Sequence, residues 1–151
     1  MALNVNAPNP KAKLTFIVED REGNIVEIDD DIVFTTVGKQ ETMDLMRGLG
    51  TAAAISHMAL GNDDTTPSLS DTMLGNELYR ETIDQHDRSG LTVTIITVVD
   101  YGEGNGAGSV TYKEAGWLND AIAGELFVRA TFAGKVKDNT VKWTLVLTIT
   151  G

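Results

Sequence analysis

The residue types that most often perform chemistry in proteins are few and scattered in this chain. It has two histidines, His57 and His86, and no cysteine. A zinc site needs three or four His, Cys or carboxylate ligands at set spacings, which neither histidine has around it. Ser56 precedes His57, but a nucleophilic serine also needs an orienting buried carboxylate and an oxyanion hole, and no GxSxG segment is present. We therefore expect no catalytic residue, no metal, no cofactor and no enzymatic activity.

A glycine-rich segment, Gly102–Gly108, begins like the GxGxxG motif of dinucleotide-binding proteins. Position 107, however, is alanine, and the SVTYK sequence that follows has a strand pattern and not a helical one. Without a helix N-terminus, nothing there would anchor a pyrophosphate group. The segment is instead interpreted as a long, flexible hairpin tip.

Two acidic clusters could supply oxygen ligands to a hard cation such as calcium: Asp29–Asp31, and Asn62–Asp64 together with Asp71. Neither has EF-hand spacing. Solvated carboxylates in turns are the favoured interpretation of both clusters, and calcium binding stays open as the alternative.

The charge of the chain limits its partners. Its 151 residues include 12 basic and 22 acidic side chains, for a formal net charge of −10. Phosphate backbones and anionic lipid surfaces would repel such a chain, so we expect neither nucleic acid nor a membrane as a partner. No apolar run reaches the roughly 18–20 residues of a transmembrane helix, and residues 1–13 lack the apolar core of a signal peptide.

Alternating apolar and polar residues indicate a chain built mostly from β-strands. The alternation is clearest in residues 140–150, where one face carries only apolar side chains: Val141, Trp143, Leu145, Leu147 and Ile149. Residues 91–100 form the strongest strand pattern. From Ile96 onward this strand is apolar on both faces, which predicts burial against a second sheet or another subunit.

One helix is expected, over residues 38–49, with Thr36 as its N-cap. Met43, Met46 and Leu49 recur every three residues, which indicates a side that packs against the core. Many short strands and one short helix predict an all-β fold, an antiparallel β-sandwich or jelly-roll-like domain over residues 14–151. Residues 1–13 are predicted to form an extended N-terminal arm, either a frayed terminus or an arm lying on a neighbouring subunit.

Five residues are expected to have structural roles: Gly61, Glu114, Trp117, Arg129 and Trp143. Gly61 ends an apolar run and opens a polar loop. Glu114 and Arg129 lie among apolar neighbours, which predicts a partly buried ion pair; Arg129 should have a carboxylate partner, which the sequence does not identify.

Two blocks of the sequence follow recognisable patterns. The first follows an ALG…TTP…DT.L pattern in Ala59–Gly61, Thr65–Pro67, Asp71–Leu74, Glu77 and Arg80. The second follows an EAG.L…AR.TF…WT…TIT pattern in Glu114–Leu118, Gly124, Leu126, Arg129–Phe132, Trp143–Thr144 and Thr148–Thr150. In these two blocks the chain resembles a family of small structural proteins of tailed-bacteriophage virions, described as tail-fibre-like or virion accessory proteins.

The resemblance implies a non-enzymatic virion protein, assembled in the host cytoplasm, whose partners are other virion proteins. The favoured version is a capsid decoration (cement) protein, bound in many copies to the major capsid protein on the particle exterior. A tail-fibre or baseplate accessory protein, bound to tail proteins, is the alternative. A homo-oligomer such as a trimer is expected. Trimeric coiled-coil heptads and collagen-like repeats, which would favour a fibre, are missing from the sequence.

Two segments are the candidate subunit interfaces: the arm, with Ala2, Leu3, Asn4 and Val5, and the apolar strand residues Ile96, Val98 and Val99. A carbohydrate- or receptor-binding module is a further alternative. An exposed pair formed by Trp117 and Tyr101 would favour sugar binding, whereas the apolar character of the EAGWL block favours a buried Trp117.

Overall fold

The computed structural model describes residues 11–30, 32–48 and 52–151. It contains two antiparallel sheets and one helix. The strands are β1 (Lys11–Asp20), β2 (Ile25–Asp30), β3 (Ile32–Phe34), β4 (His57–Gly61), β5 (Glu77–Thr82), β6 (Gln85–Ser89), β7 (Thr92–Val99), β8 (Ser109–Leu118), β9 (Leu126–Asp138) and β10 (Val141–Thr150), and the helix is α1 (Thr36–Met46).

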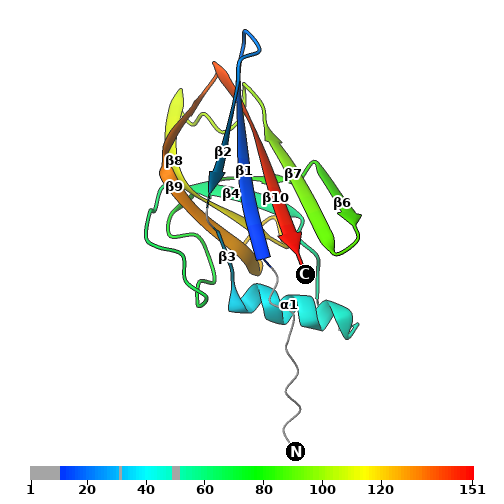
Figure 1. Cartoon of the computed structure of the whole chain (residues 1–151). Coiled ribbons are helices and arrows are strands. Elements are labelled where there is room, and N and C mark those ends of the chain that lie inside the picture. Colours follow the sequence, from blue (N-terminus) through cyan, green and yellow to red (C-terminus); the bar gives the residue numbers. More distant parts are fainter. Residues whose placement is uncertain (1–10, 31, 49–51) are drawn as a thin grey trace, which may run out of the picture.

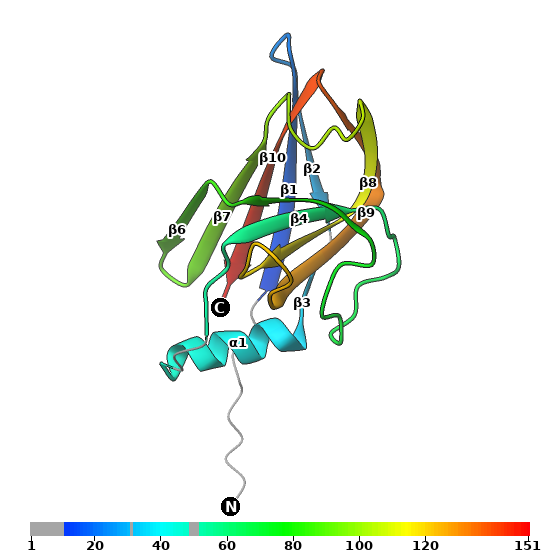
Figure 2. The same ribbon diagram turned by 180° about the vertical axis from the view of Figure 1, so that it is seen from behind.

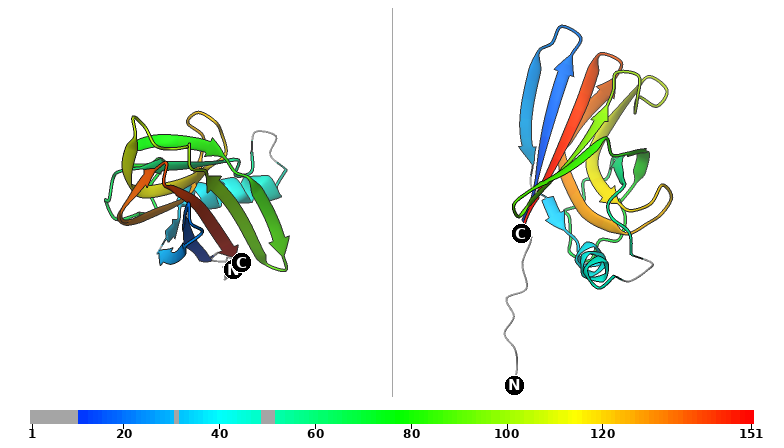
Figure 3. Two further views of the ribbon diagram at one scale, coloured as in Figure 1. Left: turned by 90° about the horizontal axis from the view of Figure 1, so that it is seen from above. Right: turned by 90° about the vertical axis from the view of Figure 1, so that its right-hand side faces the viewer.

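Each sheet has five strands. We call them sheet A, in the order β2-β1-β10-β7-β6, and sheet B, in the order β3-β9-β8-β4-β5. Seen edge-on, they lie face to face as two layers (Figure 3). This arrangement confirms the predicted all-β sandwich. Within it, the chain repeatedly passes from one layer to the other, for example between β2 and β3 and between β5 and β6.

The core lies between the two sheets and is formed by the apolar side of the alternation. Trp143, Leu145 and Leu147 of β10 are buried, as predicted for one face of this strand. Aromatic rings from both sheets meet there edge to face, with Trp143 centroids 5.6 Å from Phe16 and 5.7 Å from Tyr112. Such contacts add to the apolar area that each ring buries.

Strand β1 begins three residues earlier than the predicted domain boundary. Lys11 pairs with Thr150 and Ala12 with Ile149, so residues 11–13 belong to sheet A and not to an arm. The candidate arm residues Ala2, Leu3, Asn4 and Val5 lie outside the described residues.

Helix α1 also differs from the prediction. It begins at Thr36 because the Thr35 side chain, not that of Thr36, accepts a hydrogen bond from the Gly38 amide at 3.0 Å. Its methionines are not core residues: Met43 is 55% and Met46 71% exposed. The physical reason is its position, because α1 closes one end of the sandwich and packs mainly against β9 (Figure 2). None of the helices in the described part of the chain is long and apolar enough to cross a membrane.

The glycine-rich segment is not a hairpin tip, because β7 and β8 belong to different sheets. It crosses the end of the sandwich opposite α1 (Figure 1). Tyr112 donates a hydrogen bond to the Gly104 carbonyl at 2.7 Å, and the buried Lys137 ammonium donates one to Asn105 at 2.9 Å. The crossing is therefore held to the core by side chains of β8 and β9.

Replacement of Trp143 by alanine should lower the free energy of unfolding by about 3–5 kcal/mol, because it leaves a cavity beside Phe16 and Tyr112. Thr144→Ala is the matched control on the same strand, pointing away from the core, and should cost about 1 kcal/mol or less. Urea unfolding of both variants measures the difference. Equal losses for the two variants would contradict the core assignment.

Candidate functional site: the Glu114–Arg129 centre and the outer face of sheet A

The loop formed by residues 62–76, between β4 and β5, covers part of the outer face of sheet B. Under it lies a small second apolar cluster, made by Ala59, Leu74, Leu118 and Leu126. Gly116 allows the loop to approach, since a Cβ there would come within 2.7 Å of the Leu74 side chain. The parts of β4, β8 and β9 that lie under this loop are thus covered on both faces, whereas an isolated sandwich layer would be covered on one.

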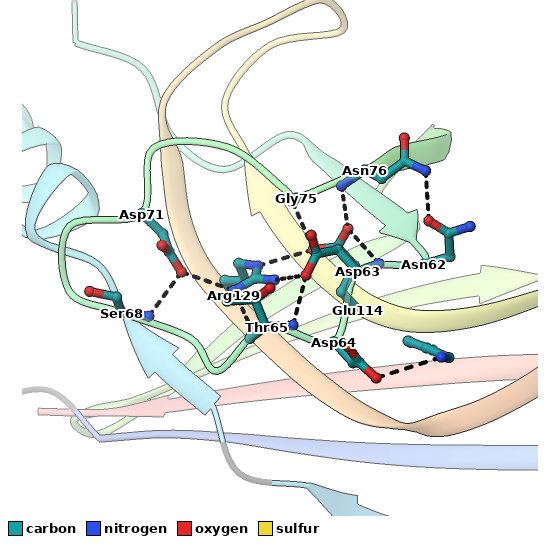
Figure 4. Close-up of polar contacts among 11 residues, drawn as sticks. Asn62, Asp63, Asp64, Thr65, Ser68, Asp71, Gly75, Asn76, Glu114 and Arg129 are labelled. Carbon is teal, nitrogen blue, oxygen red and sulfur yellow. Dashed lines mark hydrogen bonds and ion pairs between the residues drawn. The ribbon is translucent and has the colours of Figure 1, made fainter.

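Arg129 lies at the centre of this covered face and is 3% exposed. Its Nε donates to Glu114 Oε2 at 3.0 Å, and its Nη1 donates at 3.0 Å to Asp71 Oδ2 and to the Thr65 carbonyl. Its Nη2 lies 3.7 Å from Asp63 Oδ1. Figure 4 shows the guanidinium enclosed by these groups. Glu114 extends from strand β8, and the other groups belong to the loop.

Glu114 is fully buried and binds the far end of the same loop. Its two carboxylate oxygens accept hydrogen bonds from the Gly75 amide at 2.9 Å and the Asn76 amide at 2.8 Å. A side chain at Gly61 would overlap the Asn76 carbonyl and the Glu114 carboxylate. The predicted carboxylate partner of Arg129 is thus confirmed. Gly61 ends β4 as predicted, but the close approach of the loop and of Glu114, and not a left-handed backbone, requires glycine there.

The acidic cluster at Asn62–Asp64 and Asp71 serves the same centre. A hydrogen bond from the Thr65 side chain, one from the Thr65 amide and the charge of Arg129 lower the pKa of Asp63. Asp64 lies 3.5 Å from Lys113. The carboxylates of Asp63, Asp64 and Asp71, which calcium would need as ligands, therefore already lie beside cationic side chains of the protein. Within residues 11–30, 32–48 and 52–151, no group of His, Cys, Asp and Glu side chains could hold a metal ion.

The two histidines lie apart in the structure. Ser56 Oγ and His57 Nδ1 are 2.7 Å apart, but among the described residues no carboxylate hydrogen-bonds to His57. His86 is exposed on the edge strand β6. The Ser56–His57 pair therefore lacks the third member that orients the imidazole in a catalytic triad.

A second polar group, which the sequence did not indicate, lies under the glycine-rich segment. The Tyr79 hydroxyl donates to Glu81 Oε2 at 2.8 Å, whereas the buried Oε1 has no hydrogen-bond partner. Burial, opposed by the Tyr79 hydrogen bond and assisted by the nearby carboxylates of Glu103 and Asp84, raises the pKa of Glu81 from 4.5 to about 7. This carboxyl group is a candidate proton-binding group near neutral pH.

The outer face of sheet A is uncovered in the described part of the chain (Figure 1). Side chains that alternate with the core residues of β1, β10 and β7 make this face, and most are neutral and β-branched: Thr15, Ile17, Thr144, Val146, Thr148, Thr94, Ile96 and Val98. Lys142 and Glu19, at one end, neutralise each other at 3.2 Å. Lys13, near the other end of β1, lies on the same side of the sheet. We call these eleven side chains the sheet A face.

The structure separates the three candidate interface residues of the apolar strand. Ile96 and Val98 lie on the sheet A face and are half-buried. Val99 is fully buried in the core, so its assignment to an interface is wrong. The reason is the period of two along a strand, which turns adjacent residues to opposite faces.

The aromatic pair expected of a sugar-binding surface is not formed. Trp117 is fully buried in the core, as the apolar character of its block favoured. The Tyr101 hydroxyl donates to the Asp20 carbonyl at 2.9 Å, and the Arg21 guanidinium lies 4.4 Å from the centre of its ring. Tyr101 therefore joins two loops at the end of the sandwich.

Comparison of the chain with protein-family models, with curated proteins and with solved structures finds no match.

Substitution of Arg129 by methionine should cost about 3–5 kcal/mol of unfolding free energy, because it leaves the Glu114 carboxylate buried without its partner. Adding Glu114→Gln to this variant should recover part of the loss, since the uncompensated charge is then removed. Arg47→Met is the control: Arg47 pairs with Asp44 at 3.3 Å on the surface, and its loss should cost less than about 1 kcal/mol. Denaturant unfolding measures all three; a double variant less stable than Arg129→Met would contradict the buried-charge explanation.

Glu81 should make the protein less stable as pH rises. Its folded-state pKa is about 7 against an ordinary 4.5, so the folded state holds this proton more tightly than the unfolded state. The stability that protonation gives is complete below about pH 4.5 and is lost as pH rises through about 7. Glu81→Gln, which keeps an acceptor for Tyr79, should therefore be more stable than the wild type at about pH 8, by about 1 kcal/mol after allowance for partial solvent exposure.

Urea unfolding across this pH range measures the effect as the difference between the variant and the wild type. This difference should shrink towards pH 4.5. Glu22→Gln, which removes a carboxylate from an exposed turn, is the control, and the change with pH should be larger for Glu81→Gln than for this variant. An equal change for the two variants would show that the Glu81 carboxyl titrates normally.

Proposed function

We propose that this protein is a non-enzymatic structural component of a tailed-phage virion, most simply a capsid decoration protein bound in many copies on the particle exterior. The observation that carries the proposal is the sheet A face, a neutral, β-branched surface that the described part of the chain leaves uncovered. The sequence resemblance in the two blocks supplies the phage context.

The charge of the molecule supports the use of this face for association. A chain with a net charge of −10 repels its own copies over most of its surface. The sheet A face concentrates threonine, valine and isoleucine and holds its one acid, Glu19, in an ion pair with Lys142. Contact through this face therefore buries apolar area, and the exposed Asp87, opposite Thr94 on the edge strand β6, lies at its margin.

The size of the face supports the same use. The three strands that carry this face, about 4.8 Å apart and each about eight residues long at about 3.4 Å per residue, present roughly 390 Å² in projection. A standard protein–protein interface buries about 800 Å² on each partner. One neighbouring subunit, or one capsid protein surface, is therefore enough to cover it.

The two alternatives to a capsid decoration protein would use different surfaces of the molecule. A tail-fibre or baseplate accessory protein would use the same face, with tail proteins as partners. A carbohydrate-binding module loses its proposed aromatic platform, because Trp117 is buried.

Immunogold electron microscopy of purified phage particles tests the proposed location. Antibody raised against this protein should label the heads, with many gold particles on each. Label confined to the tails would replace the decoration assignment with the tail alternative. Particles free of both label and the protein itself, by mass spectrometry, would overturn the proposed function.

The sheet A face also predicts the effect of charge on self-association. Ile96 of β7 and Val146 of β10 lie directly opposite each other on neighbouring strands. Replacing both by aspartate places two carboxylates in the middle of the face. Light scattering should find an oligomer for the wild type, such as a trimer, and a monomer for the double variant, because the buried charges would be unpaired. Val136→Asp, at an apolar residue 53% exposed elsewhere on β9, is the control and should keep the wild-type mass. A wild-type monomer, or a double variant of unchanged mass, would contradict homo-oligomer formation through this face.

A further inference from the structure

An apolar groove opens between helix α1 and the end of the sandwich nearest to it. Its volume is about 320 Å³, and seven of its lining side chains are large and apolar: Phe34, Leu45, Ile55, Val93, Ile95, Phe127 and Ile149. Among the residues that the structure describes, the polar side chains that line it are those of Thr42 and His86. Sites of about 300–1,000 Å³ are large enough to bury several side chains or a small ligand. The groove can therefore hold the apolar side chains of a short peptide segment.

The beginning of the described chain lies at the rim of this groove. Ile149 lines the groove and pairs with Ala12 on the neighbouring strand, one residue after β1 begins at Lys11. Residues 1–10 therefore connect to the domain beside the groove. Figure 1 shows the start of β1 and helix α1 at the same end of the molecule.

The composition of residues 1–10 matches the groove. The segment MALNVNAPNP has no charged side chain, although the whole chain contains 34 among its 151 residues. Leu3 and Val5 are two residues apart, so in an extended peptide both would point to the same side, with Asn4 on the other. A neutral peptide with two aliphatic side chains on one side is the ligand that a nearly uncharged apolar groove would take.

The prolines favour a groove on another copy of the chain over the groove of the same copy. Pro8 and Pro10 fix their own φ angles and bias the residues before them towards extended conformations. Residues 7–10 would thus carry Leu3 and Val5 away from the end of their own sheet. A return to the adjacent groove would require the chain to reverse within a few residues.

We propose that the groove binds Leu3 and Val5 from the N-terminal segment of a second copy of this chain. This contact between copies would act in addition to the sheet A face and so deepens the proposed function. The inference rests on that function only for the place of the assembly, the phage particle. Exchange of such segments would link the copies without using the acidic parts of the surface.

Cysteine cross-linking tests the proposal with full-length protein, because the chain has no cysteine of its own. A Leu3→Cys variant is mixed with an Ala54→Cys variant, where Ala54 is exposed and lines the groove, and disulfides form under mild oxidation. The control mixes Leu3→Cys with Ala107→Cys, an exposed alanine in the glycine-rich segment at the other end of the sandwich. The expected result is a heterodimer yield at least tenfold above that of the control.

Two results would overturn the proposal. One is a heterodimer yield equal to that of the control. The other is a disulfide that forms only within single molecules of the doubly substituted Leu3→Cys/Ala54→Cys protein, which would mean that the groove binds the segment of its own copy. Circular dichroism of each variant confirms that the fold is retained before the yields are compared.

A second pair of variants tests which side chains enter the groove without altering the sandwich. Val5→Asp in the Leu3→Cys background should lower the cross-linking yield at least fivefold, because it would place a carboxylate in the apolar groove. Asn4→Asp adds the same charge one residue away, on the other side of an extended peptide, and should leave the yield within twofold. Equal losses of yield for Val5→Asp and Asn4→Asp would overturn the assignment of Leu3 and Val5 to the side of the peptide that enters the groove. Cross-linking uses purified protein, so its outcome is independent of whether the protein is found on phage particles.

Discussion

The buried pair of Arg129 and Glu114 is the interaction on which half of this sandwich depends. Two charges removed from water are stable only when nearly all their hydrogen-bonding groups have partners. Sheet B cannot supply these partners itself, because its backbone groups are used by the neighbouring strands. The loop of residues 62–76 provides them instead: the carboxylates of Asp63 and Asp71, the Thr65 carbonyl, and the amides of Gly75 and Asn76. The pair therefore fixes the loop, and the loop in turn keeps the pair out of water.

This arrangement makes the two sheets unequal. Five consecutive residues of β9, Leu126–Ala130, are buried, because one side faces the core and the other faces the covering loop. In β10 of sheet A, buried and half-buried residues alternate, because the described chain covers one side only. The loop that supplies carboxylates to Arg129 lies on sheet B. The outer face of sheet A is therefore the one that the described part of the chain leaves free. That face is the one on which association with other proteins can depend.

Patterns within one strand were predictable from the sequence, whereas relations between strands were not. The alternation in residues 140–150 correctly gave the buried side of β10. The sequence also indicated that Arg129 needs a carboxylate, but Asp71 is 58 residues away and reaches it only because the loop folds back over the sheet. A glycine-rich segment between two consecutive strands predicts a hairpin, but β7 and β8 belong to different sheets, which the sequence does not indicate. Met43 and Met46 have the spacing of a core-facing side, but α1 lies at the rim of the sandwich, where the described part of the chain leaves both side chains exposed.

The acidity of the chain explains why its two candidate contact surfaces are neutral. Copies with a net charge of −10 repel one another at distances comparable to the Debye length, about 8–10 Å at physiological salt, so contacts between copies must gain more from apolar burial than they lose to repulsion. Surfaces that carry unpaired carboxylates fail this requirement, because burying such a group costs more than the contact returns. The sheet A face and the groove beside α1 meet it, one through β-branched side chains and a neutralised ion pair, the other through an almost purely apolar lining. The charge therefore restricts the ways in which copies could meet, and in the proposed assembly this restriction would favour these two surfaces without any further recognition chemistry.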